Sequence, residues 1–286
     1  MREGRRSSTS DWVAALRALY TPGPTGLPSV GDEAARSLLP TPLRLAVSAA
    51  HAHPLVTRAT HALLGHASLG LSIGVPLRTL VIDDFVRESA THVRQLVIVG
   101  AGLDARAYRM DELAQLRVFE LDHPATQAFK RERTRALSSR ARELTLAAID
   151  FERQSLDAVL RHHDFDANAP SLWIWEGVTM YLDPAAVDAT LEAIARVSAP
   201  GSRLAVTYLP RNFSDPVSRR LSRLGARVIG EAVRASYEPE EFGSLLLRHG
   251  FRVLTDDTTE DWASRWPASQ RHRVRNWERL ARAERV

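Results

Sequence analysis

The sequence predicts an α/β fold: a Rossmann-like, seven-stranded, mostly parallel sheet with helices on both faces and an N-terminal helical lid. From about residue 77, short apolar or β-branched runs alternate with helical stretches. Such alternation is typical of βαβ units, whose strands run parallel. The preceding residues instead show helical periodicity interrupted by prolines. We therefore expect a lid over residues 1–76 and an α/β domain over 77–286.

Three helical stretches are expected in the lid. The first begins at Ser10 or Asp11, either of which is a suitable N-cap, and the others span about 31–51 and 54–68.

In the α/β domain the strands are expected at 96–99, 118–121, 144–149, 172–175, 204–208 and 251–254, and the helices near 79–91, 104–114, 124–139, 152–163, 184–199 and 239–249. Residues 211–236 interrupt the alternation and are interpreted as a helical insertion. The last stretch, 279–286, is expected to form a short edge strand or a helix, and a strand is favoured.

The composition excludes several classes of protein. The 286-residue chain is 44% hydrophobic and 25% charged, which are ordinary values for a globular protein. It has no cysteine, which excludes disulfides, thiolate zinc sites and a cysteine nucleophile and is consistent with a cytoplasmic location. No apolar run is long enough for a transmembrane helix. The net charge of +4 is scattered, so neither a nucleic acid nor a membrane is an expected partner.

A glycine turn follows the first strand of the domain. Gly100, Ala101 and Gly102 precede Asp104 at the start of the next helix. Glycines there allow a tight turn and a close approach of a ligand to the backbone, and ligands of parallel sheets bind beyond the carboxyl ends of strands. The pattern lacks the third glycine of a full dinucleotide fingerprint, and a tight turn without a ligand remains the alternative.

Carboxylates follow the next three strands. Asp122 ends the second strand about twenty residues after the glycines, the position that suits a ribose diol, and Glu120 points to the same face but lies deeper. Asp150 and Phe151 follow the third strand and suit an exocyclic amine and a purine ring. Glu176 follows the fourth, where a buried carboxylate needs a cationic or hydrogen-bond-donating partner. Capping roles for Asp122 and Asp150 remain the alternatives.

In this order the motifs resemble those of the class I S-adenosylmethionine-dependent methyltransferases, and more closely the leucine carboxyl methyltransferase-like group. That group includes phosphatase-modifying carboxyl methyltransferases and bacterial O-methyltransferases of natural-product pathways. The resemblance is carried by RTLVIDD at 78–84, VIVGAGLDARAYRM at 97–110, FELDHPATQAFKRER at 119–133, the Asp-Phe pair at 150–151 and WEGVTMYL at 175–182.

The resemblance implies a role for each matching residue toward the cofactor S-adenosyl-L-methionine, whose product is S-adenosyl-L-homocysteine. Arg78 would pair with the methionine carboxylate, Asp122 would hold the ribose, and Glu176 would face the amino group. Gly100 and Gly102 would lie beneath the cofactor, while Asp150 and the Phe151 backbone would contact the adenine. A second N-terminal basic residue often assists the carboxylate, and the candidates here are Arg36, Arg44 and Arg58.

The expected reaction is methyl transfer to a carboxylate or phenolic oxygen of a small molecule, a secondary metabolite of a natural-product pathway. Candidates for a general base are Tyr181, Tyr208, His53, His61 and His66. Alternatives are a protein C-terminal carboxyl methyltransferase, a nicotinamide-dependent oxidoreductase and a non-catalytic S-adenosylmethionine-binding protein. No metal site is expected, because the adjacent Asp83 and Asp84 would point in different directions on a helix. The sequence leaves open whether the chain is a monomer or a homodimer.

Overall fold

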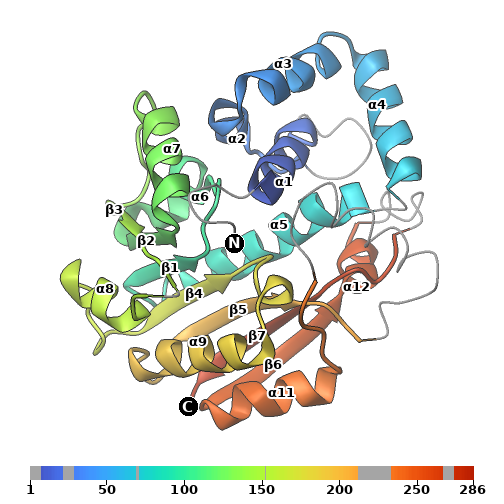
Figure 1. The fold of residues 1–286 in the computed structure, drawn as a ribbon. Helices are drawn as coiled ribbons and strands as arrows, with labels where there is room; N and C mark the ends of the chain where they lie inside the picture. Colours follow the sequence, from blue (N-terminus) through green and yellow to red (C-terminus); the bar gives the residue numbers. More distant parts are fainter. Residues whose placement is uncertain (1–7, 22–28, 69–70, 152, 212–232, 267–273) are drawn as a thin grey trace.

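The computed structural model describes residues 8–21, 29–68, 71–151, 153–211, 233–266 and 274–286 (Figure 1). Its helices are α1 (Ser8–Leu19), α2 (Glu33–Leu38), α3 (Thr41–Ala50), α4 (Pro54–Ala67), α5 (Leu71–Ser89), α6 (Arg106–Arg109), α7 (Pro124–Thr134), α8 (Leu156–His162), α9 (Pro184–Arg196), α11 (Pro239–Arg248) and α12 (Thr259–Ser264). Its strands are β1 (Gln95–Val99), β2 (Arg117–Asp122), β3 (Glu143–Ala148), β4 (Ser171–Trp175), β5 (Arg203–Tyr208), β6 (Phe251–Thr258) and β7 (Arg279–Arg285).

The seven strands form one sheet in the order β3-β2-β1-β4-β5-β7-β6. Strands β1 to β5 are parallel, and β7 runs antiparallel to both β5 and β6. The predicted mostly parallel sheet is therefore confirmed. The chain proceeds outward from β1 through β2 to β3 and then returns to β4 on the other side of β1. The carboxyl ends of β1 and β4 therefore lie side by side as a place for a ligand.

The last stretch of the chain is a strand, but the expectation that it lies at the edge of the sheet is wrong. Strand β7 lies between β5 and β6, and β6 forms the edge. Its arginines are accommodated there because the neighbouring strand supplies carboxylates: Arg279 bonds Asp256 at 3.0 Å, and Arg282 bonds Asp257 at 2.8 Å.

The two faces of the sheet bury different residues of the same strands. On one face Val97, Phe119 and Trp173 pack with residues of α8, α9 and α11. On the other face Leu96 and Val118 pack with residues of α5, α6 and α12. This alternation follows from the two-residue period of a strand, and it gives the predicted helical layers on both faces.

The N-terminal helices lie against the end of the sheet where the glycine turn is found (Figure 1). A third apolar cluster joins small residues of α1 and α2 to Leu103 and Ala105 of the turn. The single helix expected over 31–51 is instead two helices, α2 and α3. Pro40 separates them, and Leu39 before it is extended with ψ of 146°, as steric conflict with a following proline requires.

Helix α5 begins at Leu71 and includes Pro76, so it runs across the expected boundary between residues 76 and 77. The division into a lid and an α/β domain stays a prediction. The helix expected at 104–114 is the short α6 followed by a 3-10 turn, Asp111–Gln115. Most of the expected insertion at 211–236 lies outside the described residues. No helix in the described ranges has the length and apolar character needed to cross a bilayer.

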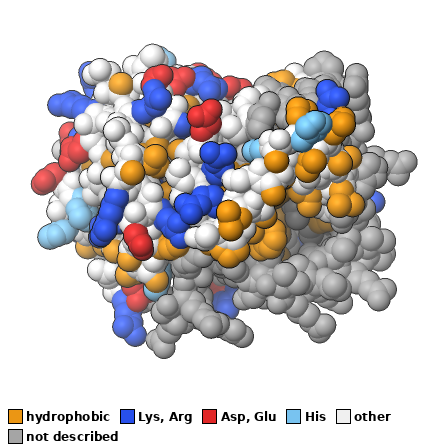
Figure 2. All heavy atoms as spheres, turned by 90° about the horizontal axis from the view of Figure 1, so that it is seen from above, with side chains coloured by type: hydrophobic (Ala, Val, Ile, Leu, Met, Phe, Trp, Pro, Cys, Tyr) orange, Lys and Arg blue, Asp and Glu red, His pale blue; other side chains and the backbone are white. Residues whose placement is uncertain are grey.

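The outer surface of the N-terminal helices carries exposed apolar side chains. Seen from above, hydrophobic side chains gather on one part of the face shown in Figure 2. The large apolar residues exposed on α3 and α4 are Leu45, Leu55, Val56 and Leu63. Val47 and Ala50 of α3 and Thr57 and His61 of α4 are buried, so these helices leave apolar side chains on their outer surface as well.

Candidate cofactor site

The glycine turn lies at the carboxyl end of β1. Gly100 and Gly102 have φ of 68° and 51°, in the left-handed region where a side chain is strained. A Cβ at Gly100 would lie 2.7 Å from Val178, and a Cβ at Gly102 would lie 3.0 Å from Ser10. The turn is thus closely covered by the loop after β4 and by the start of α1, and only glycine fits both positions.

Asp122, at the end of β2, is bonded to this turn. Its Oδ2 accepts a hydrogen bond from the backbone N–H of Gly102 at 2.6 Å, and its Oδ1 accepts one from His123 at 2.6 Å. Burial raises the pKa of Asp122, although these backbone bonds oppose the shift. An ionised carboxylate has about four lone-pair sites, so Asp122 retains acceptor capacity for a ribose diol.

Asp150 and Phe151 follow β3. The N–H of Ile149, just before them, donates to the carbonyl of Asp122 at 2.9 Å, which brings the ends of β2 and β3 together. Asp150 is half-buried, and Phe151 is 41% exposed. Their placement leaves the Phe151 ring accessible to a planar ligand.

Arg78 and Glu176 come from α5 and from the residue after β4. The Nε atom of Arg78 donates to Oε1 of Glu176 at 2.8 Å, and its Nη1 donates to Oε2 of Glu278 at 2.6 Å. Two carboxylates thus share one guanidinium, and they raise the pKa of Arg78 although burial opposes this. Glu278 is a site residue that the sequence did not indicate, because it lies 200 positions from Arg78, just before β7.

Glu176 is also bonded to Arg106 of α6. Nη1 of Arg106 donates to Oε2 of Glu176 at 2.9 Å, so both oxygens of this carboxylate are occupied. Burial opposes ionisation of Glu176, but Arg78 and Arg106 outweigh it and lower its pKa to about 2. Arg106 was not predicted as a site residue from the sequence, and the Asp-x-Arg-x-x-Arg pattern at 104–109 is the signal that could have indicated it.

Asp104 follows the turn in the chain, and Glu120 lies two residues before Asp122 in β2. Asp104 bonds the side chain of Arg106 and its N–H, the latter at 2.7 Å. Burial opposes its ionisation, and Arg106 together with Arg17 lowers its pKa to about 2. Glu120 is fully buried and pairs with Lys130 of α7. Asp104 and Glu120 each pair with a neighbouring cation, which favours a supporting structural role for both.

The candidate bases are dispersed. His53 is exposed at the start of α4. His61 is fully buried and stacked on Tyr20. His66 is in α4, and its side chain lies outside the described residues. Tyr181 is half-buried in a 3-10 turn after β4.

Tyr208 is buried in the core, where its hydroxyl donates to Asp256 at 2.6 Å. Burial and Asp256 raise its pKa, which makes the phenol harder to ionise. The described contacts therefore favour a structural role for Tyr208 and for His61.

Arg17 of α1 is a basic residue of the N-terminal helices that contacts the glycine turn. Its Nε donates to Asp32 at 2.8 Å, and its Nη2 donates to the carbonyl of Leu103 in the turn. Of the residues considered from the sequence, Arg36 and Arg58 are exposed and Arg44 is half-buried. The apolar face of α1 holds Arg17 against the turn, a placement that helical periodicity alone does not reveal.

The site fits an amino acid zwitterion beside a nucleoside. Within the described residues Nη2 of Arg78 makes no hydrogen bond, and Oε1 of Glu278 is buried without a partner. This ion pair therefore retains a donor on Arg78, which suits the carboxylate of an amino acid, and an acceptor on Glu278, which suits its ammonium group. The close glycine turn and Asp122 supply the adjoining cradle and ribose acceptor.

Together, the strand order, the glycine turn and the carboxylates at consecutive strand ends define the class I methyltransferase fold. The family model for leucine carboxyl methyltransferase matches residues 11–195, well over half of the chain. The protein therefore belongs to the leucine carboxyl methyltransferase family, which confirms the family predicted from the motifs.

Curated relatives agree with this assignment. A protein from Mycobacterium marinum named "Putative S-adenosyl-L-methionine-dependent methyltransferase" is 34% identical over 71% of this chain and 70% of its own. A protein of the same name from Mycolicibacterium paratuberculosis is 40% identical over 54% of this chain. That match spans about half of the relative, 51% of its length. The cofactor in these names is the one that the motifs imply.

Solved structures support the fold. A crystal structure from Thermobifida fusca, described as a putative methyltransferase, superposes with a TM-score of 0.62 at 20% identity and covers 99% of this chain and 96% of its own. Magnesium protoporphyrin IX methyltransferase from Synechocystis, solved with bound S-adenosylhomocysteine, gives a TM-score of 0.50 at 12% identity over 76% of this chain and 85% of its own.

Proposed function

We propose that this protein is an S-adenosylmethionine-dependent O-methyltransferase that acts on a carboxylate or phenolic hydroxyl of a small molecule, a secondary metabolite. The observation that carries this proposal is the joint placement of Arg78, Glu176 and Asp122 near the glycine turn, at the carboxyl ends of the central strands. Membership in a carboxyl methyltransferase family supports oxygen as the acceptor atom.

Each residue of the site binds a different part of the cofactor. Arg78 holds the methionine carboxylate through a charge-assisted bond, while Glu176 and Glu278 keep the guanidinium in a fixed orientation. Asp122 accepts from the ribose hydroxyls, and the backbone of the glycine turn allows the ligand to approach closely. When bound, the cofactor supplies a methyl group on a sulfonium, which is already a good leaving group.

The main contribution of the protein is therefore positioning. Holding an oxygen nucleophile about 3 Å from the methyl carbon and in line with the breaking bond removes much of the entropic barrier. A carboxylate acceptor is ionised at neutral pH and needs no base, whereas a phenol gains from one. Participation of a general base would therefore favour a phenol as the acceptor, and its absence would favour a carboxylate.

Calorimetric titration with S-adenosylhomocysteine tests the cofactor, with NADH as the control ligand. We expect micromolar binding that Asp122→Ala loses. The matched control is Asp84→Ala, because Asp84 is an exposed acid whose partner Arg87 is also exposed. Binding of NADH alone would favour an oxidoreductase instead, and binding of neither ligand would remove the methyltransferase proposal.

A second experiment tests the acceptor. Transfer of an isotopically labelled methyl group is measured with small carboxylic acids, with phenols and with peptides that end in a free carboxylate. Turnover on peptides alone would identify a protein carboxyl methyltransferase, and tight cofactor binding without turnover would favour a non-catalytic protein. If the variants His53→Ala, His61→Ala and His66→Ala all keep the full rate, no base comes from these histidines.

Other expectations accompany this proposal. The cysteine-free composition supports a cytoplasmic location, and the scattered charge supports a partner other than nucleic acid or membrane. The acceptor itself is the proposed partner.

A further inference from the structure

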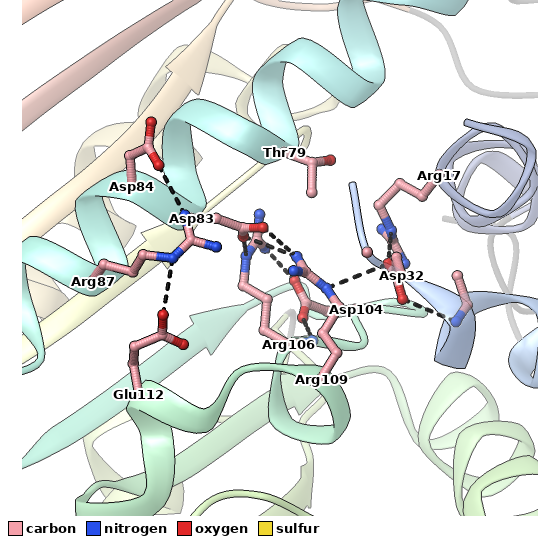
Figure 3. Close-up of polar contacts among 12 residues, drawn as sticks. Arg17, Asp32, Thr79, Asp83, Asp84, Arg87, Asp104, Arg106, Arg109 and Glu112 are labelled. Carbon is pink, nitrogen blue, oxygen red and sulfur yellow. Dashed lines mark hydrogen bonds and ion pairs between the residues drawn. The ribbon is translucent and has the colours of Figure 1, made fainter. Parts of the chain in front are cut away.

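A continuous series of buried ion pairs joins the N-terminal helices to the cofactor site. It begins at Arg17 of α1, which bonds Asp32 just before α2. Nε of Arg109 in α6 lies 3.6 Å from Oδ2 of Asp32, and Nη2 of Arg109 donates a hydrogen bond to Oδ1 of Asp83 in α5 at 2.9 Å (Figure 3).

The series then reaches residues already assigned to the site. Asp83 bonds Nε of Arg106 at 2.8 Å, and Arg106 bonds Glu176, the partner of Arg78. Figure 3 shows the Asp83 carboxylate between the side chains of Arg106 and Arg109. The Asp83 carboxylate therefore links Arg109, which faces the N-terminal helices, to Arg106, which bonds Glu176.

The members of the series are buried or nearly buried, and the most exposed side chain, that of Glu176, is 10% exposed. The exposed fraction of the side chain is 6% for Arg17, 0% for Asp32 and 1% for Asp83. Away from water the attraction between such charges is stronger and less screened by salt than on the surface. A change in the position of one member therefore affects its neighbours more than an exposed pair would.

Asp83 and its neighbour Asp84 give an internal comparison. Adjacent residues of a helix are expected to point in different directions. Asp84 pairs locally, since it bonds Arg87 at i+3 and is half exposed. Asp83 instead contacts two arginines of another helix and is buried. The Asp83 carboxylate thus lies between α5, to which it belongs, and α6, which carries both arginines.

The N-terminal helices also contact the cofactor turn directly. Arg17 donates to the Leu103 carbonyl, and the Cβ position of Gly102 is 3.0 Å from Ser10. Asp32 caps α2 by accepting from Ala35 at 2.9 Å while it binds Arg17. The seating of α1 and α2 and the geometry of the turn are therefore fixed by the same groups.

We propose that Asp32, Arg109 and Asp83 are positioning residues, which couple the seating of α1 and α2 to the orientation of Arg106 and Glu176 and so to cofactor affinity. This inference rests on the proposed function. None of the three is placed in contact with the cofactor; they act through Arg106. Because coupling between two binding events is reciprocal, cofactor binding then stabilises the N-terminal helices by the same factor.

The test measures both sides of this coupling. S-adenosylhomocysteine affinity is determined by calorimetry, and hydrogen exchange of α1 and α2 amides is followed with and without the ligand. Asp83→Asn and Asp32→Asn keep the shape of each side chain and remove its charge. We expect each to weaken binding about tenfold and to reduce the ligand-induced protection of α1 and α2 by a matching factor.

Three further variants make the result specific. Asp84→Asn is the matched control and should leave both measurements unchanged. The double variant Asp32→Asn/Asp83→Asn should weaken binding little more than the stronger single variant, since residues of one network are not additive. Arg109→Lys retains the positive charge beside Asp32 and Asp83. It should therefore fold even if a neutral replacement of Arg109 does not, and it should keep part of the ligand-induced protection of α1 and α2.

The outcomes separate this inference from the proposed function. If the wild type binds the ligand and Asp32→Asn and Asp83→Asn bind it equally well, the coupling is overturned while the methyltransferase proposal stands. Additive losses with unchanged protection of α1 and α2 would also overturn it, because they indicate separate structural damage. A wild type that does not bind S-adenosylhomocysteine would overturn both.

Discussion

Arg78 and Glu176 bind one another directly, with 2.8 Å between Nε and Oε1. The family resemblance instead implies that Arg78 pairs with the carboxylate of the cofactor's methionine part and that Glu176 faces its amino group. Glu278 bonds the other side of the guanidinium at 2.6 Å. In the proposed binding mode the cofactor meets a preformed array in which Arg78 is held by two carboxylates. An arginine fixed in this way loses little freedom when a further carboxylate binds.

Replacing Arg78 should affect both binding and stability. Arg78→Gln leaves Glu176 and Glu278 without this cation, and removing one partner of a buried pair costs about 3–5 kcal/mol. We expect S-adenosylhomocysteine affinity to fall at least about tenfold, equivalent to about 1.4 kcal/mol. Arg78→Lys should restore only part, because an ammonium cannot form the planar fork between two carboxylates. Calorimetry and urea unfolding measure the two effects.

Arg87→Gln is the control for this experiment. Arg87 pairs with Asp84 and Glu112, but its side chain is 46% exposed, and exposed pairs contribute about 0–1 kcal/mol. Its replacement should change neither quantity appreciably. An Arg78→Gln variant that binds as tightly as the wild type would contradict the assignment of Arg78.

The glycine turn gives a prediction that separates backbone strain from steric conflict. Gly100→Ala places a Cβ 2.7 Å from Cγ2 of Val178 at φ of 68°, whereas Gly201→Ala meets nothing within 4 Å at φ of 78°. Gly201→Ala should cost only the left-handed strain, about 1–2 kcal/mol. Gly100→Ala should cost more and should also weaken cofactor binding, because the turn must shift.

Val178→Ala supplies the matching rescue. In the double variant Gly100→Ala/Val178→Ala the contact is relieved, so the stability should return toward that of Gly201→Ala once the cost of Val178→Ala alone is subtracted. Urea unfolding of the four variants measures this. Equal losses for Gly100→Ala and Gly201→Ala would show that the loop after β4 moves aside freely.

The sequence was most informative about elements whose signal is local. Apolar runs predicted the strands, and the glycines and Asp122 predicted the turn that the structure places at the ends of β1 and β2. Helix breaks were less visible: the periodicity over 31–51 continues across Pro40, although the chain leaves the helix there. The position of β7 beside β6 was not predicted. There Arg279 and Arg282 of β7 pair with Asp256 and Asp257 of β6, and no periodicity of the sequence reveals such pairs.

Long-range ion pairs explain the residues that the sequence missed. Arg78 meets Glu278 across 200 positions, and Arg106 meets Asp83 across 23. Nothing near Glu278 in the chain distinguishes it from a surface acid. The adjacent Asp83 and Asp84 have the same local surroundings, yet only Asp83 is buried. Such differences depend on which helix packs above each side chain.

The buried Glu120 predicts a specific pH dependence of stability. Burial raises its pKa to about 7 in the folded protein, well above the ordinary value of 4.5, although Lys130 opposes the shift. Between these values the folded state binds more protons than the unfolded state, so the Glu120 contribution to stability falls as pH rises from about 4.5 to 7. The shift corresponds to about 3 kcal/mol.

Removing the pair isolates this contribution. The double variant Glu120→Gln/Lys130→Met removes both charges, so it avoids leaving an unpaired cation in the interior. Its free energy of unfolding, measured with urea from pH 5 to 8, should fall less steeply with rising pH than that of the wild type. Parallel profiles would mean that Glu120 is ionised throughout this range.

Lys130, the one lysine of the chain, makes the opening of this region measurable by chemistry. Its side chain is 0% exposed and bonded to Glu120, so an amine-reactive acylating reagent should modify only the α-amino group of the native protein. Modification of Lys130 requires local or global opening, which should slow it by at least about a thousandfold relative to the chain in urea. Intact mass and peptide mapping follow the two amines separately. Glu120→Gln should accelerate modification by weakening the pair, and native labelling at the rate of a free amine would refute the buried position.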